Sequence, residues 1–431
     1  MASTSLLFMP KLFIPPLILL IMKTEIDTVK GFQDYLPPES LKREAIKKIV
    51  EKWFKLYGFS PVETPVIEFD ELMQSNTEDE AVSDRFRLKD KGNRELGLRY
   101  EFTFQLARIL KKNPTIKLPF KRYQIGEVFR DEPLRVGRTR QFTQCDADIV
   151  GDESVNADAE CLALVADILD ELKIKDFEIR INNRALLEAM IKSVEIEDIK
   201  NTMRELDKLE KIGEDMVKAN LRKYASANQI ITLFKLLEKD IKFFIKNAFA
   251  GAEELQELEE TCAFYGLNVK INPTLVRGLG YYTGNIFEFS LLSKKNSLVG
   301  GGRFDNSVGE YINKKIPAVG ISFSLEALMG LCEEEISQLK LEQIPKTILI
   351  SISQEKSTIA LAKKLRKEEI SCMTSFDKPS KAMEYANAQK IPYVIFVGTE
   401  EIEKKMFKLK DMTSGEEKLM GEKQLIKFLG K

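Results

Sequence analysis

Two neighbouring stretches, KRYQIGEVFR (residues 121–130) and RQFTQCDADIVG (residues 140–151), decide the fold class. Both mix β-branched, aromatic and polar residues in the manner of half-buried strands, and the polar, arginine-rich residues between them predict the tip of a β-hairpin. Side chains alternate between the two faces of a strand, so Gln144 and Asp148 share one face of the second stretch. The hairpin predicts that the first part of the chain is built on an antiparallel sheet.

Helical and extended patterns surround this hairpin. A periodic apolar face predicts an amphipathic helix that starts near Pro38 and stops at Gly58. The segment FSPVETPVIEF (59–69) is expected to be extended, because its prolines exclude helix. Further helices are expected at 104–111 and 156–172, and further strands at 177–182 and within 267–292.

The character of the sequence changes twice along the chain. Residues 187–256 combine long helical periods with dense Lys and Glu, which predicts a helical insertion. A charged linker at 333–345 is expected to lead to a C-terminal domain, 346–431, in which short apolar strands alternate with helices around a largely parallel sheet. The expected fold is an α+β core with an antiparallel sheet (22–186 and 257–332), the helical insertion and this C-terminal α/β domain.

The first 21 residues contain an apolar run that has some features of a signal peptide or membrane anchor. Pro10, Pro15 and Pro16 interrupt the run, no small-residue cleavage site follows, and the run is short for a bilayer span. We interpret residues 1–21 as an extension ahead of a natural start at Met22, outside the fold, with a targeting segment as the alternative.

The composition excludes several kinds of chemistry. The 431 residues include no histidine, which excludes every mechanism that uses an imidazole as base, relay or metal ligand. Five widely spaced cysteines without a C-x-x-C pair favour reduced thiols in a cytoplasm, so no metal site built from His or Cys is expected. With 66 basic and 67 acidic residues, the net charge of −1 gives no indication of a nucleic-acid partner.

Positive charge is nevertheless concentrated between Gln105 and Arg140, where ten basic residues accompany three acidic ones. Such a run is most often a solvated surface. At the hairpin, however, arginines outnumber lysines, and arginine is the planar donor that grips phosphate with two hydrogen bonds. A polyanion such as a nucleoside triphosphate or an RNA end is therefore the favoured partner of this region.

Four polar residues are candidates for binding a smaller ligand. Glu101 and Thr103, in LRYEFT (98–103), are two apart and would share a strand face. Together with Gln144 and Asp148 they offer two carboxylates, an amide and a hydroxyl, which suit a cationic or ammonium-bearing ligand. On spacing alone, strand residues that face water remain the simpler interpretation.

Two glycine-rich segments complete the candidates. RGLGYYTG (277–284) combines an arginine, close backbone approach and two tyrosines with flat faces and polar tips. The glycines of VGGGRFDN (299–306) suggest a phosphate loop, but no G-K-[ST] ending follows. A tight strand that another backbone approaches is the favoured interpretation of those glycines.

Taken in order, these segments resemble the class II aminoacyl-tRNA synthetases and, more narrowly, the histidyl-tRNA synthetase family. VKGFQDYLPPE (29–39) resembles the family's opening, VETPVIE (62–68) its first class motif, which builds the dimer interface, and FRDE (129–132) with the loop to RQF its second. The family-specific similarity lies in LRYEFT, RQFTQCDADIVG, ELDKLEKIG (205–213), RGLGYYTG and GGGRFDN, and KAMEYANAQKIPYVIFVG (381–398) is similar to the anticodon-binding domain.

The resemblance implies a cytoplasmic homodimer, without membrane contact, that activates L-histidine with ATP and Mg²⁺ and transfers it to tRNA(His). It implies roles for particular residues: Arg130 and Arg277 in catalysis, on the α-phosphate; Arg130, Glu132, Phe142 and Arg277 in ATP binding; Glu101, Thr103, Gln144, Asp148, Tyr281 and Tyr282 in histidine binding; and Arg135, Arg138 and Arg140 at the tRNA acceptor end.

Two positions depart from the family pattern. The third class motif ends in an arginine that grips the ATP phosphates, but SFSLEALM (322–329) has Ala327 there, and Gly280 replaces the Asp that usually follows Arg-Gly-Leu. Arg303 or a lysine is a candidate to compensate. The alternative function is a non-catalytic, histidine-binding paralogue that resembles the regulatory subunit of ATP phosphoribosyltransferase, which Ala327 favours and the C-terminal domain disfavours.

Overall fold

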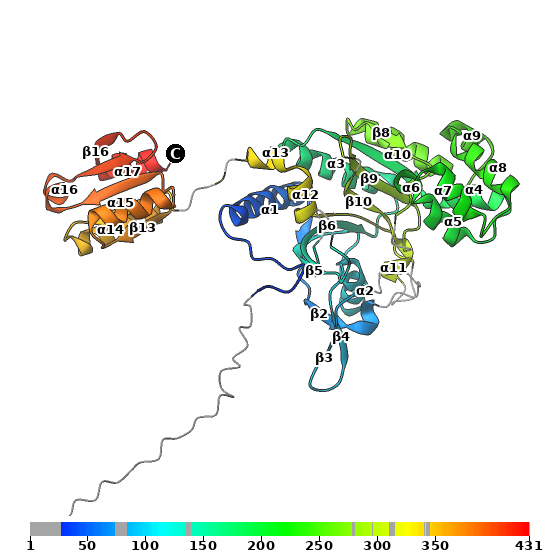
Figure 1. Ribbon diagram of the computed structural model, residues 1–431, viewed down its shortest axis with the longest axis horizontal. Coiled ribbons are helices and arrows are strands. Elements are labelled where there is room, and N and C mark those ends of the chain that lie inside the picture. The colour runs from blue at the N-terminus through cyan, green and yellow to red at the C-terminus, as the bar shows by residue number, and fades with distance from the viewer. Residues whose placement is uncertain are drawn as a thin grey trace, which may run out of the picture. The chain divides into compact units, whose positions relative to one another are not determined.

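The computed structural model describes residues 27–73, 84–134, 139–277, 281–294, 296–309, 315–339, 341 and 345–430. The chain divides into two compact units, Met1–Ser337 and Gln338–Lys431, whose elements are labelled in Figure 1. Glu333–Ser337, expected in the linker, instead form helix α13 of the first unit.

An eight-stranded sheet is the centre of the first unit. Neighbouring strands are antiparallel except at the two edges, where β1 pairs with β5 and β7 with β8 in parallel. The predicted antiparallel core is therefore confirmed. The strand order is β1 (Ser60–Pro61), β5 (Phe120–Phe129), β6 (Gln141–Val150), β11 (Ala318–Ser324), β10 (Ser297–Arg303), β9 (Asn285–Leu291), β7 (Phe177–Asn183) and β8 (Val269–Ile271).

Strands β5 and β6 form the predicted hairpin, in which Phe129 lies opposite Gln141. The predicted amphipathic helix is α1 (Glu39–Leu56), and its Ile46, Val50 and Phe54 are completely buried. Gly58, at φ +79°, ends the helix as expected, because the chain turns through the left-handed region there.

The other elements of the core flank this sheet. The LRYEFT segment was expected to be a strand, which is wrong: β4 ends at Leu98 and α2 begins at Thr103. A small sheet contains β2 (Ile67–Phe69), β4 (Glu95–Leu98) and β3 (Arg87–Lys89). The helices are α2 (Thr103–Lys112), α3 (Val155–Glu171), α11 (Asp305–Gly309), α12 (Leu325–Leu331) and α13 (Glu333–Ser337), with a 3₁₀ helix, η2 (Asp70–Met73).

Residues 184–264 form a succession of helices, as the sequence predicts for most of this region. In Figure 1, α4, α5, α7, α8 and α9 cluster at one end of the first unit. Helix α10 packs against α3 and the β7–β8 edge of the sheet. The helices are α4 (Arg184–Ser193), α5 (Ile199–Leu206), α6 (Leu209–Ile212), α7 (Glu214–Leu221), α8 (Ala227–Leu237), α9 (Ile241–Lys246) and α10 (Ala252–Phe264).

The second unit is a five-stranded sheet with helices on both faces. Its strand order is β13 (Cys372–Ser375), β12 (Thr347–Ser351), β14 (Tyr393–Val397), β15 (Met406–Asp411) and β16 (Glu417–Gly421). One core cluster joins α14 (Glu355–Lys367) and α17 (Glu422–Leu429) to the sheet, and a second joins α15 (Pro379–Ala388). The short helix α16 (Thr399–Lys404) connects β14 to β15.

The expected parallel sheet is correct only for β13, β12 and β14. Strands β15 and β16 are antiparallel, and β16 was not predicted. Five residues connect β15 to β16, which is enough for a hairpin and too few for a parallel crossover. The sequence pattern showed where β15 lies but not its direction.

Candidate active site

A cavity of about 350 Å³ lies beside the β5–β6 hairpin and over strands β10 and β11. The start of α2, the first turn of α12 and the segment after β8 close its other sides. Most of the residues proposed from the sequence meet here: Glu101, Thr103, Arg130, Glu132, Phe142, Gln144, Arg277, Tyr281 and Tyr282 all line the cavity.

Arg130 projects from the end of β5 between two aromatic rings. Its guanidinium carbon lies 4.4 Å from the centroid of the Tyr100 ring and 5.0 Å from that of Phe142. Its Nε donates to the Tyr100 carbonyl (3.3 Å) and its Nη2 to Oε1 of Gln144 (3.4 Å). These hydrogen-bond acceptors are neutral, so they orient the guanidinium while leaving its positive charge available to the cavity.

Arg277 is held differently. Its Nη1 donates to the Glu288 carboxylate on β9 (2.8 Å), and its side chain is 24% exposed. The guanidinium lies against Gly300, where any Cβ would overlap it. A Cβ on Gly301 would likewise collide with the Gly320 carbonyl of β11. The glycines of β10 thus permit close approach, as the favoured sequence interpretation predicts, and Gly300 serves an arginine side chain.

Two buried carboxylates, those of Glu101 and Asp146, face the cavity, each 3% exposed. The Tyr281 hydroxyl donates to Oε2 of Glu101 (3.1 Å), and Nε2 of Gln144 donates to Oδ2 of Asp146 (2.8 Å). Burial, with the nearby charge of Asp146, raises the pKa of Glu101 to about 7. Burial also raises the pKa of Asp146, although Arg122 opposes the shift. Two buried carboxylates of this kind are stabilised in their ionised form by a cationic group on a ligand.

Asp148 does not reach this cavity, contrary to the expectation that it would bind the ligand with Gln144. Its carboxylate is ion-paired with Arg122 (2.5 Å), and both residues are buried. It lies against Gly320 of β11, whose missing side chain leaves room for it. Asp146 lines the wall instead and was missed, although the same strand alternation places residues 144, 146 and 148 on one face.

The opposite face of β6 is braced by a buried ion pair. Arg43 of α1 donates through Nη2 to Glu326 of α12 (2.7 Å) and to the Thr143 hydroxyl (2.8 Å). The other oxygen of Glu326 accepts the Thr143 backbone N–H (2.9 Å). The brace therefore fixes the strand between the cavity residues Phe142 and Gln144. The sequence analysis missed it, because 283 positions separate Arg43 from Glu326.

Ala327 lines the cavity with only a methyl group, and its N–H donates to the Ser324 hydroxyl (3.0 Å) in the first turn of α12. Arg303, the candidate to compensate, is buried and ion-paired with Asp158 (2.8 Å), and it is not among the cavity-lining residues. Within the described part of the chain, Arg130 and Arg277 are the basic residues that line this cavity.

The three arginines assigned to the tRNA acceptor end are described only in part. Arg135 and Arg138 lie outside the described residues. Arg140 ion-pairs with Asp131 (3.1 Å) and donates from Nε to the Glu132 carbonyl (3.2 Å). Arg140 thus stabilises the base of the hairpin loop, and it does not line the cavity.

Two features are absent from the described residues. They contain no group of three or more Cys, Asp or Glu arranged to hold a metal ion. No helix among them is long and apolar enough to cross a membrane. All five cysteines are free thiols, and four of them are buried.

Comparisons with known proteins agree with this architecture. A family model for histidyl-tRNA synthetases matches residues 31–328, and a model for an anticodon-binding domain matches residues 346–431. Histidine–tRNA ligase 1 of Bacillus cereus is 35% identical over 416 residues, which cover 91% of this chain and 97% of that protein.

Solved structures give the same result. The crystal structure of histidyl-tRNA synthetase from Nostoc sp. PCC 7120 superposes with a TM-score of 0.81 at 28% identity, covering 94% of this chain and 98% of that one. An ATP phosphoribosyltransferase regulatory subunit/histidyl-tRNA synthetase from Bacillus halodurans C has a TM-score of 0.70 at 20% identity, covering 84% and 96%. At that identity the second likeness shows the fold alone.

Proposed function

The chain belongs to the histidyl-tRNA synthetase family and is a ligase of the class II aminoacyl-tRNA synthetase fold, and from this premise we propose that it activates L-histidine with ATP and then esterifies the 3′ end of tRNA(His). The observation that carries the proposal is the composition of the cavity, in which two arginines and two buried carboxylates meet. The arginines suit the phosphates of ATP, and the carboxylates suit the cationic groups of histidine.

In the activation step, a carboxylate oxygen of histidine attacks the α-phosphorus of ATP. The new bond joins that oxygen to phosphorus, the bond from the α-phosphorus to the bridging oxygen of pyrophosphate breaks, and the electron pair leaves with pyrophosphate. The attacking group is already an anion, so no protein base is required. A chain without histidine has the side chains for this chemistry, because positioning and charge stabilisation suffice.

We assign Arg130 and Arg277 to the α-phosphate, where they would stabilise the charge that develops during attack. Phe142 would stack on adenine, and Glu132 would accept a hydrogen bond from the adenine amino group. Mg²⁺ that enters with the nucleotide is held largely by phosphate oxygens and water, so it needs few carboxylates from the protein. The lack of a three-acid cluster among the described residues is compatible with this mode of binding.

Histidine would occupy the part of the cavity near Glu101, Asp146 and Tyr281. The buried carboxylates would pair with its ammonium group and imidazole, with Thr103, Gln144 and Tyr282 as further contacts. Asp148 remains in the proposal only as a support, through its ion pair with Arg122.

The second step requires tRNA, and the C-terminal anticodon-binding domain supports its participation. Arg135, Arg138 and Arg140 are proposed to meet the acceptor end. We further propose a cytoplasmic homodimer. The segment that resembles the first class motif supports the dimer, because its Val66 and Ile67 and the adjoining Phe69 are 40–57% exposed although apolar.

The non-catalytic paralogue is not favoured, since a separate model for an anticodon-binding domain matches residues 346–431 beyond the histidyl-tRNA synthetase match at 31–328. Histidine-dependent exchange of pyrophosphate into ATP tests the activation step, and histidine attachment to tRNA(His) tests the second. We expect both activities. Folded protein that binds histidine but catalyses no exchange would favour the paralogue and overturn the proposal.

A further inference from the structure

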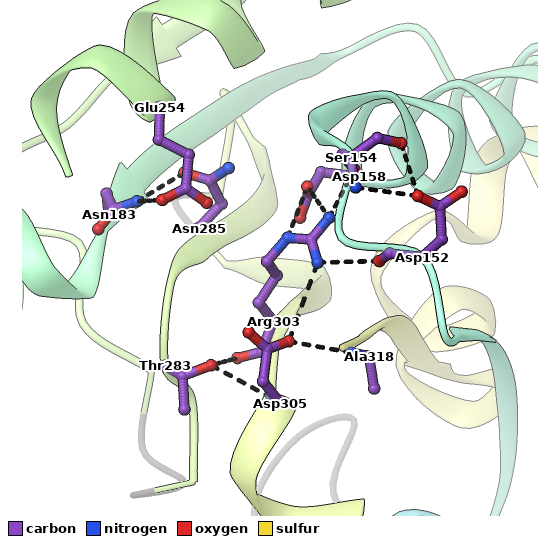
Figure 2. Close-up of polar contacts among 10 residues, drawn as sticks. All are labelled: Asp152, Ser154, Asp158, Asn183, Glu254, Thr283, Asn285, Arg303, Asp305 and Ala318. Carbon is purple, nitrogen blue, oxygen red and sulfur yellow. Dashed lines mark hydrogen bonds and ion pairs between the residues drawn. The ribbon is translucent and has the colours of Figure 1, made fainter. Parts of the chain in front are cut away.

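Arg303 ends strand β10, and all three nitrogens of its guanidinium are occupied inside the protein (Figure 2). Nε and Nη2 contact the Asp158 carboxylate of α3, at 2.9 and 2.8 Å. Nη1 donates to the Asp152 carbonyl (3.1 Å), and Nη2 also donates to the Ser154 carbonyl (2.5 Å). Arg303 is therefore an anchor that ties the end of β10 to the start of α3.

The backbone of this anchored segment holds Thr283 on two sides. The Arg303 carbonyl accepts the Thr283 N–H (2.8 Å) and, more weakly, its hydroxyl (3.4 Å). The same hydroxyl oxygen accepts the N–H of Asp305 (3.2 Å), whose carboxylate accepts the Ala318 N–H (2.9 Å). Figure 2 shows Thr283 beside the chain at Arg303 and Asp305.

The residues after Thr283 are fixed from the other direction. Nδ2 of Asn183 donates to Oδ1 of Asn285 (2.9 Å) and to the Glu254 carboxylate of α10 (3.1 Å). Asn183 and Asn285 are fully buried. The Gly284 carbonyl accepts the Arg184 N–H (2.9 Å). The segment 283–285 is thus held directly by the ends of β10 and β7 and by the starts of α11 and α4, and α3 and α10 support it through Arg303 and Asn183.

Tyr281 and Tyr282 immediately precede this fixed segment and line the cavity. Tyr281 reaches Glu101 through a single hydrogen bond of 3.1 Å. Its ring lies 4.9 Å from that of Tyr282 and 5.9 Å from that of Phe304, the neighbour of Arg303. A small shift at residue 283 is expected to move the Tyr281 hydroxyl away from Glu101, because only Tyr282 separates Tyr281 from Thr283.

We infer that Thr283 and Arg303 are positioning residues for the histidine half of the cavity: they hold Tyr281 against Glu101 without touching the substrate. This inference rests on the proposed function for its substrate. It predicts that weakening the contacts of Thr283 impairs histidine binding selectively.

The test replaces Thr283 with Val, which keeps the branched shape and removes the hydroxyl, and with Ser, which keeps the hydroxyl. We expect Thr283→Val to raise KM for histidine about tenfold in pyrophosphate exchange, as the loss of one well-placed polar contact would, with KM for ATP changed by less than about twofold. Thr283→Ser should retain nearly wild-type values.

Thr202→Val is the matched control. Thr202, in α5, is fully buried and donates to the Asp198 carbonyl (2.7 Å) outside the cavity, so its loss should lower Tm without changing either KM. An equal rise of both KM values in Thr283→Val, or no rise in KM for histidine, would overturn the inference. Calorimetric titration of histidine into the wild type and the variant separates the two proposals. If the positioning role is correct but the proposed catalysis is wrong, the wild-type protein will bind histidine and Thr283→Val will bind it more weakly. Equal binding by both proteins would refute the positioning role.

Discussion

The cavity presents two arginines that the proposed reaction uses together but that the fold holds in different ways. Arg130 lies between the Tyr100 and Phe142 rings and donates to neutral oxygens. Arg277 lies on a glycine and donates to the Glu288 carboxylate. One wall therefore offers an arginine without a hydrogen-bonded carboxylate, and the other offers an ion pair.

This difference predicts different consequences of losing each arginine. Removal of Arg130 subtracts one positive charge from the cavity. Removal of Arg277 subtracts a positive charge and also leaves Glu288, which is 16% exposed, without its cation. An unpaired carboxylate near a triphosphate repels it, so the Arg277 wall should be the more sensitive of the two.

The largest expected effect is that of Arg277→Ala, which should reduce pyrophosphate exchange by about 10³-fold or more and leave the fold intact. Arg130→Ala should cost about 10²-fold to 10³-fold. The double variant Arg277→Ala/Glu288→Gln should recover part of the loss, because it removes the unpaired anion. Steady-state exchange kinetics measure all three, and circular dichroism checks the fold.

Two outcomes would contradict the comparison. Wild-type turnover in Arg277→Ala would remove this arginine from the catalytic residues. A double variant no better than Arg277→Ala would mean that Glu288 does not act on the nucleotide.

The next effect concerns the carboxylate half of the cavity and depends on pH. Because burial raises the pKa of Glu101 to about 7, this group is mostly protonated at pH 6 and mostly ionised at pH 8. Only the ionised form pairs with an ammonium group. Histidine affinity should therefore rise about tenfold from pH 6 to pH 8, beyond any effect of the imidazole of the substrate itself.

Glu101→Gln is the control, since it retains the titration of the substrate and of Asp146 and removes that of Glu101. The ratio of the two affinities isolates Glu101, and a ratio independent of pH would contradict the assignment.

The stability of the folded protein should change with pH in the opposite sense to histidine affinity. A carboxyl group with a raised pKa favours the folded state at low pH, and that contribution is lost as the pH rises through about 7. Without ligand, the Tm of the wild type should fall more between pH 6 and pH 8 than that of Glu101→Gln.

The sequence was sufficient for the parts of the site that depend on local pattern. The hairpin, α1 and the placement of Gln144 follow from alternation and helical periodicity, which act over a few residues, whereas Phe142 was named only through the family resemblance. Alternation also identified the face of β6 but not the depth of the cavity, so Asp148 was chosen and Asp146 was missed. Thr103 reached the cavity from a helix instead of the expected strand, because six residues are too few to distinguish the two.

Contacts between distant elements could not be predicted in this way. Arg303 looked like a free phosphate ligand because its partner Asp158 is 145 positions away. The Arg43–Glu326 brace likewise depends on α1 and α12 meeting at β6, which only the completed sheet brings about. Resemblance to a family supplied roles for cavity residues, but it gave no signal for the residues that hold them in place.

The smallest expected effect tests that brace and returns to the Arg130 wall. Glu326→Gln leaves an acceptor for the Thr143 N–H but removes the charge opposite Arg43, so β6 should become less firmly fixed beside Phe142. We expect KM for ATP to rise by a factor of about three to five, with KM for histidine changed less. Glu68→Gln is the matched control, because Glu68 is a buried carboxylate paired with Arg108 away from the cavity. Both variants should lose stability on thermal unfolding, since Glu326→Gln leaves the buried Arg43 without its counter-ion and Glu68→Gln does the same to the partly buried Arg108. If both raised KM for ATP equally, the effect would reflect general loosening, and the aromatic wall around Arg130 would not depend on support from behind the strand.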